Sequence, residues 1–460
     1  MSVTARASDL LHAAGMTAAG VGLAERGFEA SERAWLRSDG ADREPQPLFV
    51  PGRIEVLGKH TDYAGGTTLT CGVERGVCAI HAPRRDSRVV IIDALRNDRI
   101  EFVAEPGMVI RSGHWSNYPM TAVKRVSRNF GPGLRGFNLV FRNTLPSSAG
   151  LSSSSTLITS IFIVFALAND LASHPDFHGT ITTFEELSEY LGCIENGQSF
   201  GRLEGDRGVG TFGGSEDHAA MLCSAPGRIR HFAFGPLQLL RTLDVPAGHT
   251  FVVATSGIAA AKTGNAKERY NRASLLVREI LDRWTAATGR HDRTLAAALA
   301  SSAEASATLD GILDRDRSGD GLTDPLRRRL DHFRLENDRV IPAALRALET
   351  FDLEAFGRVV DDSQAGAEQL LGNQVPETIA LTRLARELGA VAASAFGAGF
   401  GGSVWALVRS DDVADFTAQW QRRYREAVPR QISDLAVFFP TAAGPPVTPL
   451  NGLLAMTKAD

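Results

Sequence analysis

The sequence has little cysteine, and its four cysteines show none of the CxxC spacing that zinc sites and redox pairs share. Cys71, Cys78, Cys193 and Cys223 are scattered along the chain. This distribution argues against a disulfide framework and is typical of a reducing compartment. We therefore expect four ordinary thiols, with no structural zinc site.

The chain also lacks an excess of one charge and any long hydrophobic run. It has 49 Lys and Arg against 53 Asp and Glu, a formal net charge of -4, so no basic field attracts nucleic acid or an anionic membrane. The most apolar internal stretch, residues 161–168, is far shorter than the roughly 20 residues of a spanning helix. The N-terminus lacks the charged start and apolar core of a signal peptide. These features predict a soluble, cytoplasmic protein with a small-molecule partner, as a monomer or small homo-oligomer.

At 460 residues the chain is long enough for two domains, each with its own core. Helical periodicity from about residue 8 to 36 predicts an N-terminal helical extension over residues 1–40. Strand and helix patterns then alternate up to about residue 245, where long amphipathic helices begin. We expect one domain at 41–245 and a second, helix-rich domain at 246–460.

The expected elements of the first domain are strands at 49–57, 76–81, 88–92 and 136–141 and helices at 117–128, 157–167 and 184–192. Those of the second domain are strands at 251–255, 391–396, 404–408 and 435–439 and helices at 265–285, 294–309, 325–349, 353–363 and 412–425.

A serine-rich loop, LPSSAGLSSSST at residues 145–156, lies between an alternating strand and a strongly apolar helix. A glycine followed by hydroxyl residues at the start of a helix is suited to wrapping backbone N–H groups around phosphate. A flexible linker is the alternative, but linkers are normally flanked by polar, disordered sequence. The residues expected to contact phosphate are Pro146, Ser147, Ser148, Ala149, Gly150, Leu151, Ser152, Ser153 and Ser154.

Two carboxylates are candidates for the chemistry beside this loop. Magnesium prefers few protein oxygens together with phosphate oxygens, so the hydroxyl of Ser153 or Ser154 and the carboxylate of Glu195, expected just after a helix, are suitable ligands. Asp217, on a glycine-flanked turn in GGSEDH, is placed to be aimed at a substrate hydroxyl. Arg53 can hold that aspartate ionised and balance charge on a transferring phosphoryl group.

A cluster of donors and acceptors, His60, Asp62 and Tyr63, suits a ligand with several hydroxyl groups. Taken singly, Asp62 is better explained as a turn cap and His60 as a surface histidine. Two GxGxxG matches are not dinucleotide-binding motifs, because neither follows a strand and opens a helix. The stretch GIAAAKT resembles a Walker A loop but is not one, because Ala261 stands where the glycine before the lysine is required.

Three stretches in the same order resemble those of one family. PGRIEVLGKHTDYAGG is similar to the galactokinase signature, PSSAGLSSSS to the ATP-binding motif of the galactokinase, homoserine kinase, mevalonate kinase and phosphomevalonate kinase (GHMP) superfamily, and FGAGFGGS to its third motif. Weaker similarity covers WSNYPMTAVKRV and NAKERYNRAS. The resemblance extends from about residue 49 to 408.

The resemblance implies an α+β fold of two domains, with mixed and antiparallel sheets and the active site in the cleft between the domains. It implies an ATP- and Mg²⁺-dependent sugar kinase in which Asp217 accepts the proton of the anomeric hydroxyl beside Arg53. It also implies that Glu195 and Ser153 or Ser154 bind magnesium. Sugar hydroxyls would meet His60, Asp62 and, more weakly, Tyr270. The glycines expected to shape the third loop are Gly397, Gly399, Gly401 and Gly402.

The chain departs from this family at several positions. Lys59 replaces the glutamate of GEHTDYNGG that contacts the distal hydroxymethyl of galactose, and Glu55 and Ala64 replace asparagines. Around Asp217 the usual MDQ is EDH. An ammonium attracts negative charge, so one hypothesis is that Lys59 binds a uronic acid or another modified sugar; the alternative is that it points to solvent or to Glu55. A non-catalytic sensor of ATP and sugar on the same fold is a further alternative.

Overall fold

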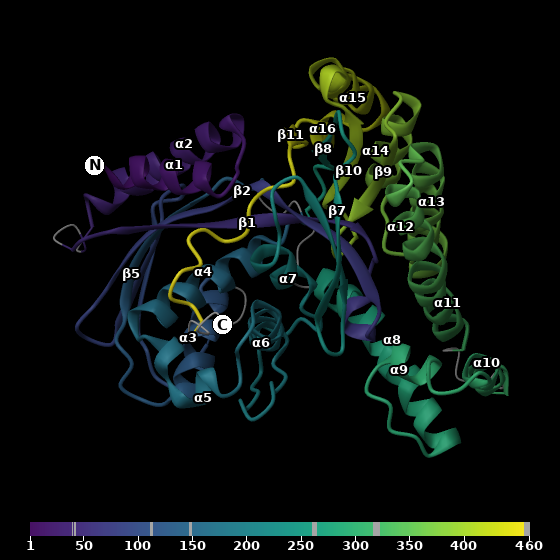
Figure 1. Cartoon of the computed structure of the whole chain (residues 1–460), viewed down its shortest axis with the longest axis horizontal. Helices are drawn as coiled ribbons and strands as arrows, with labels where there is room; N and C mark the ends of the chain where they lie inside the picture. The colour runs from purple at the N-terminus through teal and green to yellow at the C-terminus, as the bar shows by residue number, and fades with distance from the viewer. Residues whose placement is uncertain are drawn as a thin grey trace.

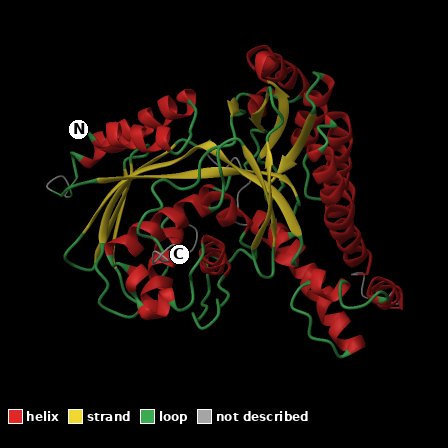
Figure 2. Ribbon diagram, viewed as in Figure 1, coloured by secondary structure: helices red, strands yellow, loops and turns green. Residues whose placement is uncertain are grey.

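The computed structural model describes residues 1–38, 40, 43–110, 114–146, 150–259, 265–315 and 323–454. Two β-sheets, each covered by helices, form the molecule (Figures 1 and 2). One sheet is mixed and the other antiparallel, which confirms the expected α+β fold. Among the described residues, no helix combines the length and apolar character needed to cross a bilayer.

The first sheet has seven strands in the order β4-β3-β5-β2-β6-β7, with β1 paired to β2. All its pairs are antiparallel except β3 with β5. Its strands are β1 (Gln46–Leu57), β2 (Thr67–Pro83), β3 (Arg88–Asp93), β4 (Asp98–Val103), β5 (Phe137–Asn143), β6 (Arg228–Ala233) and β7 (Gln238–Asp244). Pro51 and Gly52 do not end β1, because the register shifts between Pro51 and Arg53 in a β-bulge that lets pairing continue.

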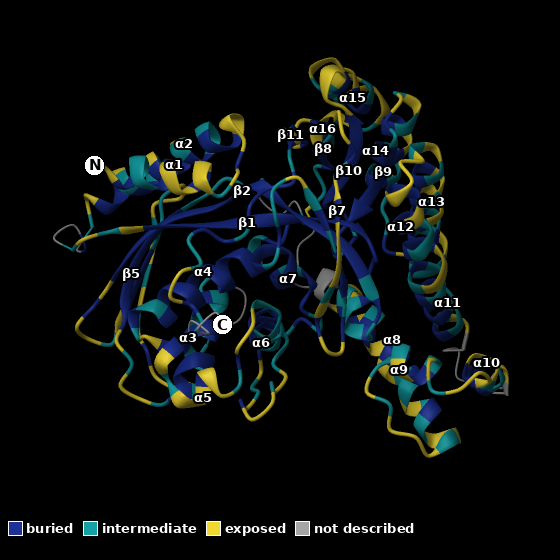
Figure 3. Ribbon diagram, viewed as in Figure 1, coloured by how far each residue is buried: buried dark blue, intermediate teal, exposed yellow. Residues whose placement is uncertain are grey.

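Helices cover both faces of this sheet, which explains why β1 and β2 are buried at nearly every position (Figure 3). On β1, Phe49 packs in the cluster under the N-terminal helices, whereas its neighbours Leu48 and Val50 pack in the opposite core. Successive side chains of a strand point to opposite faces, so both sets are buried. The helices on one face are α1 (Val3–Ala13) and α2 (Ala18–Trp35), and those on the other are α3 (Asn117–Phe130), α4 (Ser153–Ala168), α5 (Pro175–His178), α6 (Phe184–Asn196) and α7 (Glu216–Leu222).

The second sheet is antiparallel, in the order β11-β8-β10-β9. Its strands are β8 (His249–Thr255), β9 (Ala392–Phe396), β10 (Ser403–Arg409) and β11 (Phe438–Thr441). The helices of this half are α8 (Asn265–Thr288), α9 (Leu295–Leu299), α10 (Ala305–Arg315), α11 (Thr323–Arg334), α12 (Ile341–Glu349), α13 (Leu353–Gly366), α14 (Pro376–Glu387), α15 (Val413–Ala427) and α16 (Arg430–Ser433), with a π-helical turn, Leu335–Val340, joining α11 to α12.

The end of the chain returns to the first sheet. Thr448 bridges to Phe49 and Ala443 to Val73, and Val447 and Leu453 are buried in the core beneath that sheet. The two halves also share one core, in which Ile54 and Val56 of β1 pack in a cluster with the helices α12 and α13. The predicted boundaries at 40 and 245 stay predictions.

Several elements of the structure were not predicted from the sequence. Strands β4, β6 and β7 and helix α14 had no expected counterpart, the helix expected at 294–309 is divided into α9 and α10, and β11 begins three residues later than predicted. The N-terminal extension is helical as expected, but it is two helices separated at Gly15, whose φ of 83° is favourable only for glycine.

Candidate active site

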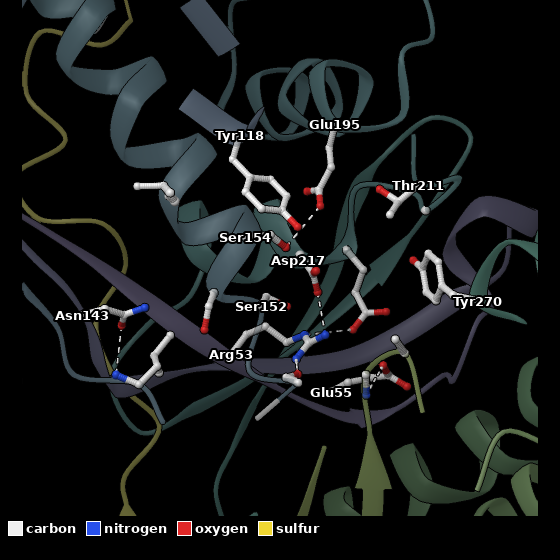
Figure 4. A pocket seen from close by; sticks show the side chains of 18 of the residues that line it. Arg53, Glu55, Tyr118, Asn143, Ser152, Ser154, Glu195, Thr211, Asp217 and Tyr270 are labelled. Atoms are coloured by element: carbon white, nitrogen blue, oxygen red, sulfur yellow. Dashed lines mark hydrogen bonds and ion pairs between the residues drawn. The ribbon is translucent and has the colours of Figure 1, made fainter. Parts of the chain in front are cut away.

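A cavity of about 360 Å³ collects most of the predicted site residues (Figure 4). Residues from both halves of the chain line it, including Tyr270 of α8 and Gly397 and Ala398 of the loop after β9. From the first half, the predicted residues that line it are Arg53, His60, Asp62, Gly150, Ser152, Ser153, Ser154, Glu195 and Asp217. The expected position of the site between two domains is supported by this lining.

The serine-rich loop ends at the N-terminus of α4, which faces the cavity. Ser152 occupies the capping position in a left-handed conformation (φ 61°), makes no capping hydrogen bond, and its buried Oγ has no partner among the described residues. The N–H groups of a first helical turn have no partner within the helix. An uncapped N-terminus at a cavity wall is therefore suited to an anion such as phosphate.

The other residues predicted for this loop differ in their placement. Pro146 and Leu151 do not line the cavity, and Leu151 is fully buried in the shared core. Ser147, Ser148 and Ala149 lie outside the described residues.

Arg53 and Asp217 form the central ion pair. The Arg53 Nη2 lies 2.7 Å from Asp217 Oδ1, and Nη1 donates to the carbonyl of Gly150 at 2.8 Å. Asp217 is the second residue of α7 rather than part of an irregular turn, so the helix start aims it. Burial alone lowers the pKa of Arg53, but the negative charges of Asp217 and Glu216 outweigh burial and raise it.

Glu195 lies in a hydrogen-bonded network beside this pair. It belongs to the last turn of α6, whereas we expected it just after a helix. Ser154 Oγ donates to one oxygen at 3.4 Å, and Ser155 Oγ lies 2.8 Å from the other and 3.2 Å from Asp217 Oδ2. Of the two serines proposed as metal ligands, Ser154 is the one that contacts Glu195; no contact of Ser153 with Glu195 is observed.

His218, which follows Asp217, buttresses Glu195 from the buried side. Its Nε2 lies 3.2 Å from Glu195 Oε2, and its Nδ1 lies 3.1 Å from the hydroxyl of Thr159. Because an ionised carboxylate only accepts, Nε2 carries the proton and Nδ1 accepts from Thr159. The histidine thus fixes the orientation of Glu195.

The turn after β1 presents His60 and Asp62 to the cavity. His60 has a φ of 57°, and its Nδ1 lies 2.9 Å from the hydroxyl of Tyr63. The ring centroid of Tyr270 is 5.6 Å from that of His60. Asp62 accepts from the backbone N–H of Glu216 at 3.4 Å, and burial together with Asp217 raises its pKa. His60 and Asp62 are therefore ordered side chains of the cavity wall.

Helix α11 and the π-helical turn hold this loop from outside the cavity. Arg329 Nη2 donates to the carbonyl of His60 at 2.5 Å. The carboxylate of Glu336 accepts from Gly58 N–H at 3.2 Å, and Asn337 accepts from Thr67 N–H at 3.0 Å. Both ends of the loop are thus anchored by the second half of the chain.

Lys59 does not line the cavity, which contradicts the hypothesis that it binds the substrate. Its ammonium is buried, with 1% of the residue exposed, and donates to Ser363 Oγ of α13 at 2.7 Å. Ser363 in turn donates to Glu336. The alternatives of a solvent-facing lysine or a direct bond to Glu55 are also not observed, because α13 and Glu336 provide a buried polar partner instead.

Among the glycines of the third loop, Gly397 is the one that lines the cavity. It has a φ of 78°, and a Cβ there would lie 2.8 Å from the carbonyl of Gly150. A side chain at this position would therefore separate the third loop from the serine-rich loop. The remaining predicted glycines, which have positive φ but do not line the cavity, are Gly399, Gly401 and Gly402.

The cavity has an aromatic end, formed by Trp115 and Tyr118, that was not predicted from the sequence. Trp115 and Tyr118 line it, and the ring of Trp115 contacts Phe141 of β5 at 6.1 Å between centroids. Asn143, two residues after Phe141, lies across the site from Tyr270 in Figure 4, with Asp217 between them. The sequence signal for Trp115 and Tyr118 was the weak family resemblance around WSNYPMTAVKRV. Without that resemblance, isolated aromatic residues usually indicate a hydrophobic core.

Carboxylates outnumber cations in the lining. Two buried acids without a predicted role, Glu55 and Glu216, both have raised pKa values because burial disfavours the charged carboxylate. The lining acids are Glu55, Asp62, Asp93, Glu195, Glu216 and Asp217, whereas the lining arginines are Arg53 and Arg96. Few cations of the lining are therefore available to pair with the carboxylate of a uronate.

Three family models match the chain. One described as the galactokinase galactose-binding signature matches residues 40–83, the GHMP kinases N terminal domain matches 117–199, and GHMP kinases C terminal matches 344–426. The first contains the turn with His60 and Asp62, and the second contains the serine-rich loop and Glu195. The matches thus cover the segments that build the cavity.

Similar proteins carry consistent names. A galactokinase of Roseiflexus sp. (strain RS-1) is 27% identical over 387 residues, covering 83% of this chain and 88% of that relative. A galactokinase of Streptococcus thermophilus is 27% identical over 392 residues, covering 83% of this chain and 90% of that relative.

Solved structures share the fold. The crystal structure of Lactococcus lactis galactokinase complexed with galactose has a TM-score of 0.73 at 23% identity, covering 91% of this chain and 98% of that one. Methanococcus jannaschii mevalonate kinase has a TM-score of 0.50 at 12% identity, covering 87% and 99%.

Proposed function

The chain belongs to the galactokinase family of the GHMP kinases, and we propose that it transfers the γ-phosphoryl group of ATP to the anomeric hydroxyl of galactose. The observation that carries the proposal is the Arg53–Asp217 ion pair, 2.7 Å long, in one cavity with the uncapped N-terminus of α4. A phosphate site and a carboxylate fixed beside it are the parts that transfer to an alcohol requires.

Asp217 is the proposed base. As the anomeric oxygen forms its bond to the γ-phosphorus and the bond to ADP breaks, the hydroxyl proton passes to the Asp217 carboxylate. Arg53 keeps that carboxylate ionised beforehand and balances charge on the transferring group. His60, Asp62 and Tyr270 are proposed to orient the sugar hydroxyls around this point.

The nucleotide is proposed to lie between the aromatic end of the cavity and the N-terminus of α4. Adenine packs well on aromatic faces, and Trp115 and Tyr118 present the aromatic rings at that end. The phosphates then reach Ser152, Ser153 and the first-turn N–H groups of α4.

Trp115→Ala is expected to raise KM for ATP by about 10-fold, because base–aromatic packing is worth ~1–3 kcal/mol per base. Steady-state kinetics at saturating galactose measure it. KM for galactose is the internal control and should change by less than about 2-fold, since Trp115 is not among the residues proposed to orient the sugar. An equal rise in both KM values would contradict an adenine site at Trp115.

Glu195 and Ser154 are the proposed magnesium ligands. Both offer hard oxygen donors, and the 3.4 Å between Ser154 Oγ and Glu195 Oε1 brings the donors to one place on the cavity wall. Among the described residues no group of three or more His, Cys, Asp or Glu is arranged to hold a metal by itself, so phosphate oxygens would complete the shell. Bound magnesium would neutralise charge on the triphosphate. His218 would keep Glu195 turned toward it.

A cytoplasmic enzyme that acts on small molecules is proposed, as a monomer or small homo-oligomer and without a nucleic-acid partner. The scattered cysteines and the formal net charge of -4 support this assignment. A sensor that binds ATP and sugar without turnover is not favoured, because Arg53, Asp217 and Glu195 are all present and mutually positioned.

The deciding experiment measures ADP release by the purified protein with ATP, Mg²⁺ and a panel of galactose, glucose, pentoses and galacturonate. Galactose should support turnover and yield a sugar 1-phosphate, whereas galacturonate should not, because Lys59, the cation considered for its carboxylate, does not line the cavity. Tight binding of ATP and galactose without product would favour the sensor instead.

A further inference from the structure

Glu55 combines burial with an unused hydrogen-bond acceptor. It lies on β1 two residues after Arg53, so both side chains emerge on the same face of the strand and both line the cavity. Glu55 is 4% exposed, and its Oε2 accepts from the backbone N–H of Gly397 at 3.1 Å. The other oxygen, Oε1, is buried and has no hydrogen-bond partner among the described residues.

Neighbouring cations do not supply the missing bond. Arg53 is committed to Asp217 and Gly150, and the ammonium of Lys59 is bound to Ser363. Both attract the Glu55 carboxylate through space, but no ion pair within 4 Å joins them to it in the described part of the chain. Within the described residues, Gly397 is thus the hydrogen-bond partner that holds Glu55, and Oε1 is left as an acceptor.

A second buried acid of the cavity, Glu216, is not equivalent. Its Oε1 is also without a hydrogen bond, but it lies 3.9 Å from Arg53 Nε, so an opposite charge faces it. Among the described residues, no cation lies within ion-pair distance of Glu55 Oε1. A buried acceptor without a donor is rare in folded proteins and indicates a bound partner that supplies one.

We propose that Glu55 is a specificity residue whose Oε1 accepts a hydrogen bond from one hydroxyl of the sugar, an assignment that rests on the proposed function. The Gly397 N–H fixes the carboxylate, and the third loop thereby aims it at the substrate. Glu55 is also one of the departures from the galactokinase signature, which has asparagine there. Lys59, which also differs from that signature, does not line the cavity. Its ammonium donates to Ser363 and attracts the Glu55 carboxylate electrostatically.

The test compares wild type with Glu55→Gln on galactose and on its monodeoxy analogues. The glutamine oxygen is needed for Gly397 N–H, so the amide NH₂ takes the position of Oε1 and an acceptor becomes a donor. We expect kcat/KM on galactose to fall by about 10-fold or more, as for loss of a hydrogen bond to a charged group. On the one analogue that lacks the bonded hydroxyl, the two proteins should agree within about 2-fold.

Controls separate the possible failures. Melting temperature and KM for ATP report whether Glu55→Gln is folded, and galactose binding by calorimetry with an unhydrolysable ATP analogue repeats the comparison without turnover. An equal loss on every analogue, or no loss on galactose, would overturn the assignment while leaving the kinase proposal intact. A wild type that does not phosphorylate galactose would overturn the proposed function, and this assignment with it.

Discussion

Asp217→Asn is expected to lower kcat with galactose by about 100-fold or more, because an amide cannot accept the proton of the attacking hydroxyl. The amide oxygen can still accept from Arg53, so the 2.7 Å contact has a replacement and the fold should persist. Steady-state kinetics with coupled detection of ADP measure the loss.

The control for this variant is nucleotide binding. The N-terminus of α4 and the aromatic end of the cavity are unchanged, so the Kd for ATP by calorimetry should stay within about 2-fold of wild type, and the melting temperature should be similar. Turnover close to wild type would remove the role assigned to Asp217.

Arg53→Met is expected to abolish turnover to a similar extent, by about 100-fold or more, and also to destabilise the protein. Removing one partner of a buried ion pair leaves uncompensated charge, which costs ~3–5 kcal/mol in full burial. Asp217 retains 19% side-chain exposure, so we expect a loss nearer ~2 kcal/mol of unfolding free energy. Urea unfolding and kinetics on the same preparation measure both effects.

The stability loss from Arg53→Met should grow with pH. Burial raises the pKa of Glu55 to about 7, above its unfolded value near 4.5, so the folded state holds that proton more tightly. The stability that this proton contributes is present below the unfolded pKa and is lost as pH rises through about 7. The positive charge of Arg53 lowers the pKa of Glu55 and so stabilises its ionised carboxylate. Without Arg53, that carboxylate is buried with less compensating charge. Because more of it is ionised at pH 8 than at pH 6, the loss of unfolding free energy should be larger at pH 8.

Arg53→Lys is the matched comparison. It keeps a cation near Asp217 but cannot bond Gly150 and Asp217 through one planar fork, so stability should recover more than activity. A variant series in which Arg53→Met has normal stability at pH 8 would contradict the role of Arg53 as the counter-charge of these acids.

Site residues that are local in the chain can be proposed from the sequence. The serine-rich loop, Asp217 and Arg53 were proposed because short strings carry their chemistry, and Arg53, Asp217 and Ser152 line one cavity. The burial of Lys59 was not predicted because its partner Ser363, which in turn donates to Glu336, lies 304 residues away and contributes no local pattern. Glu55 became recognisable as a site residue only once its unpaired oxygen was seen.

Prediction of the fold from the sequence also depends on local patterns. The predicted and observed bounds agree closely for long periodic helices and apolar strands such as α3 and β3. Strand β7 was missed because its residues are largely exposed, so no clear hydrophobic alternation marks it. The Glu195 and Asp217 segments were read as loop because glycines crowd around them, yet both residues lie in helices whose packing overrides that composition.

The return of the C-terminal segment to the first sheet has a consequence for biosynthesis. Val447 and Leu453 complete the core beneath β1 and β2, and Thr448 pairs with Phe49 near the start of the same sheet. Those side chains are synthesised after the whole second sheet, so the first half cannot complete its core until the second sheet has been translated. The nascent protein therefore carries an unfinished hydrophobic surface beneath β1 and β2 while its second half is being made.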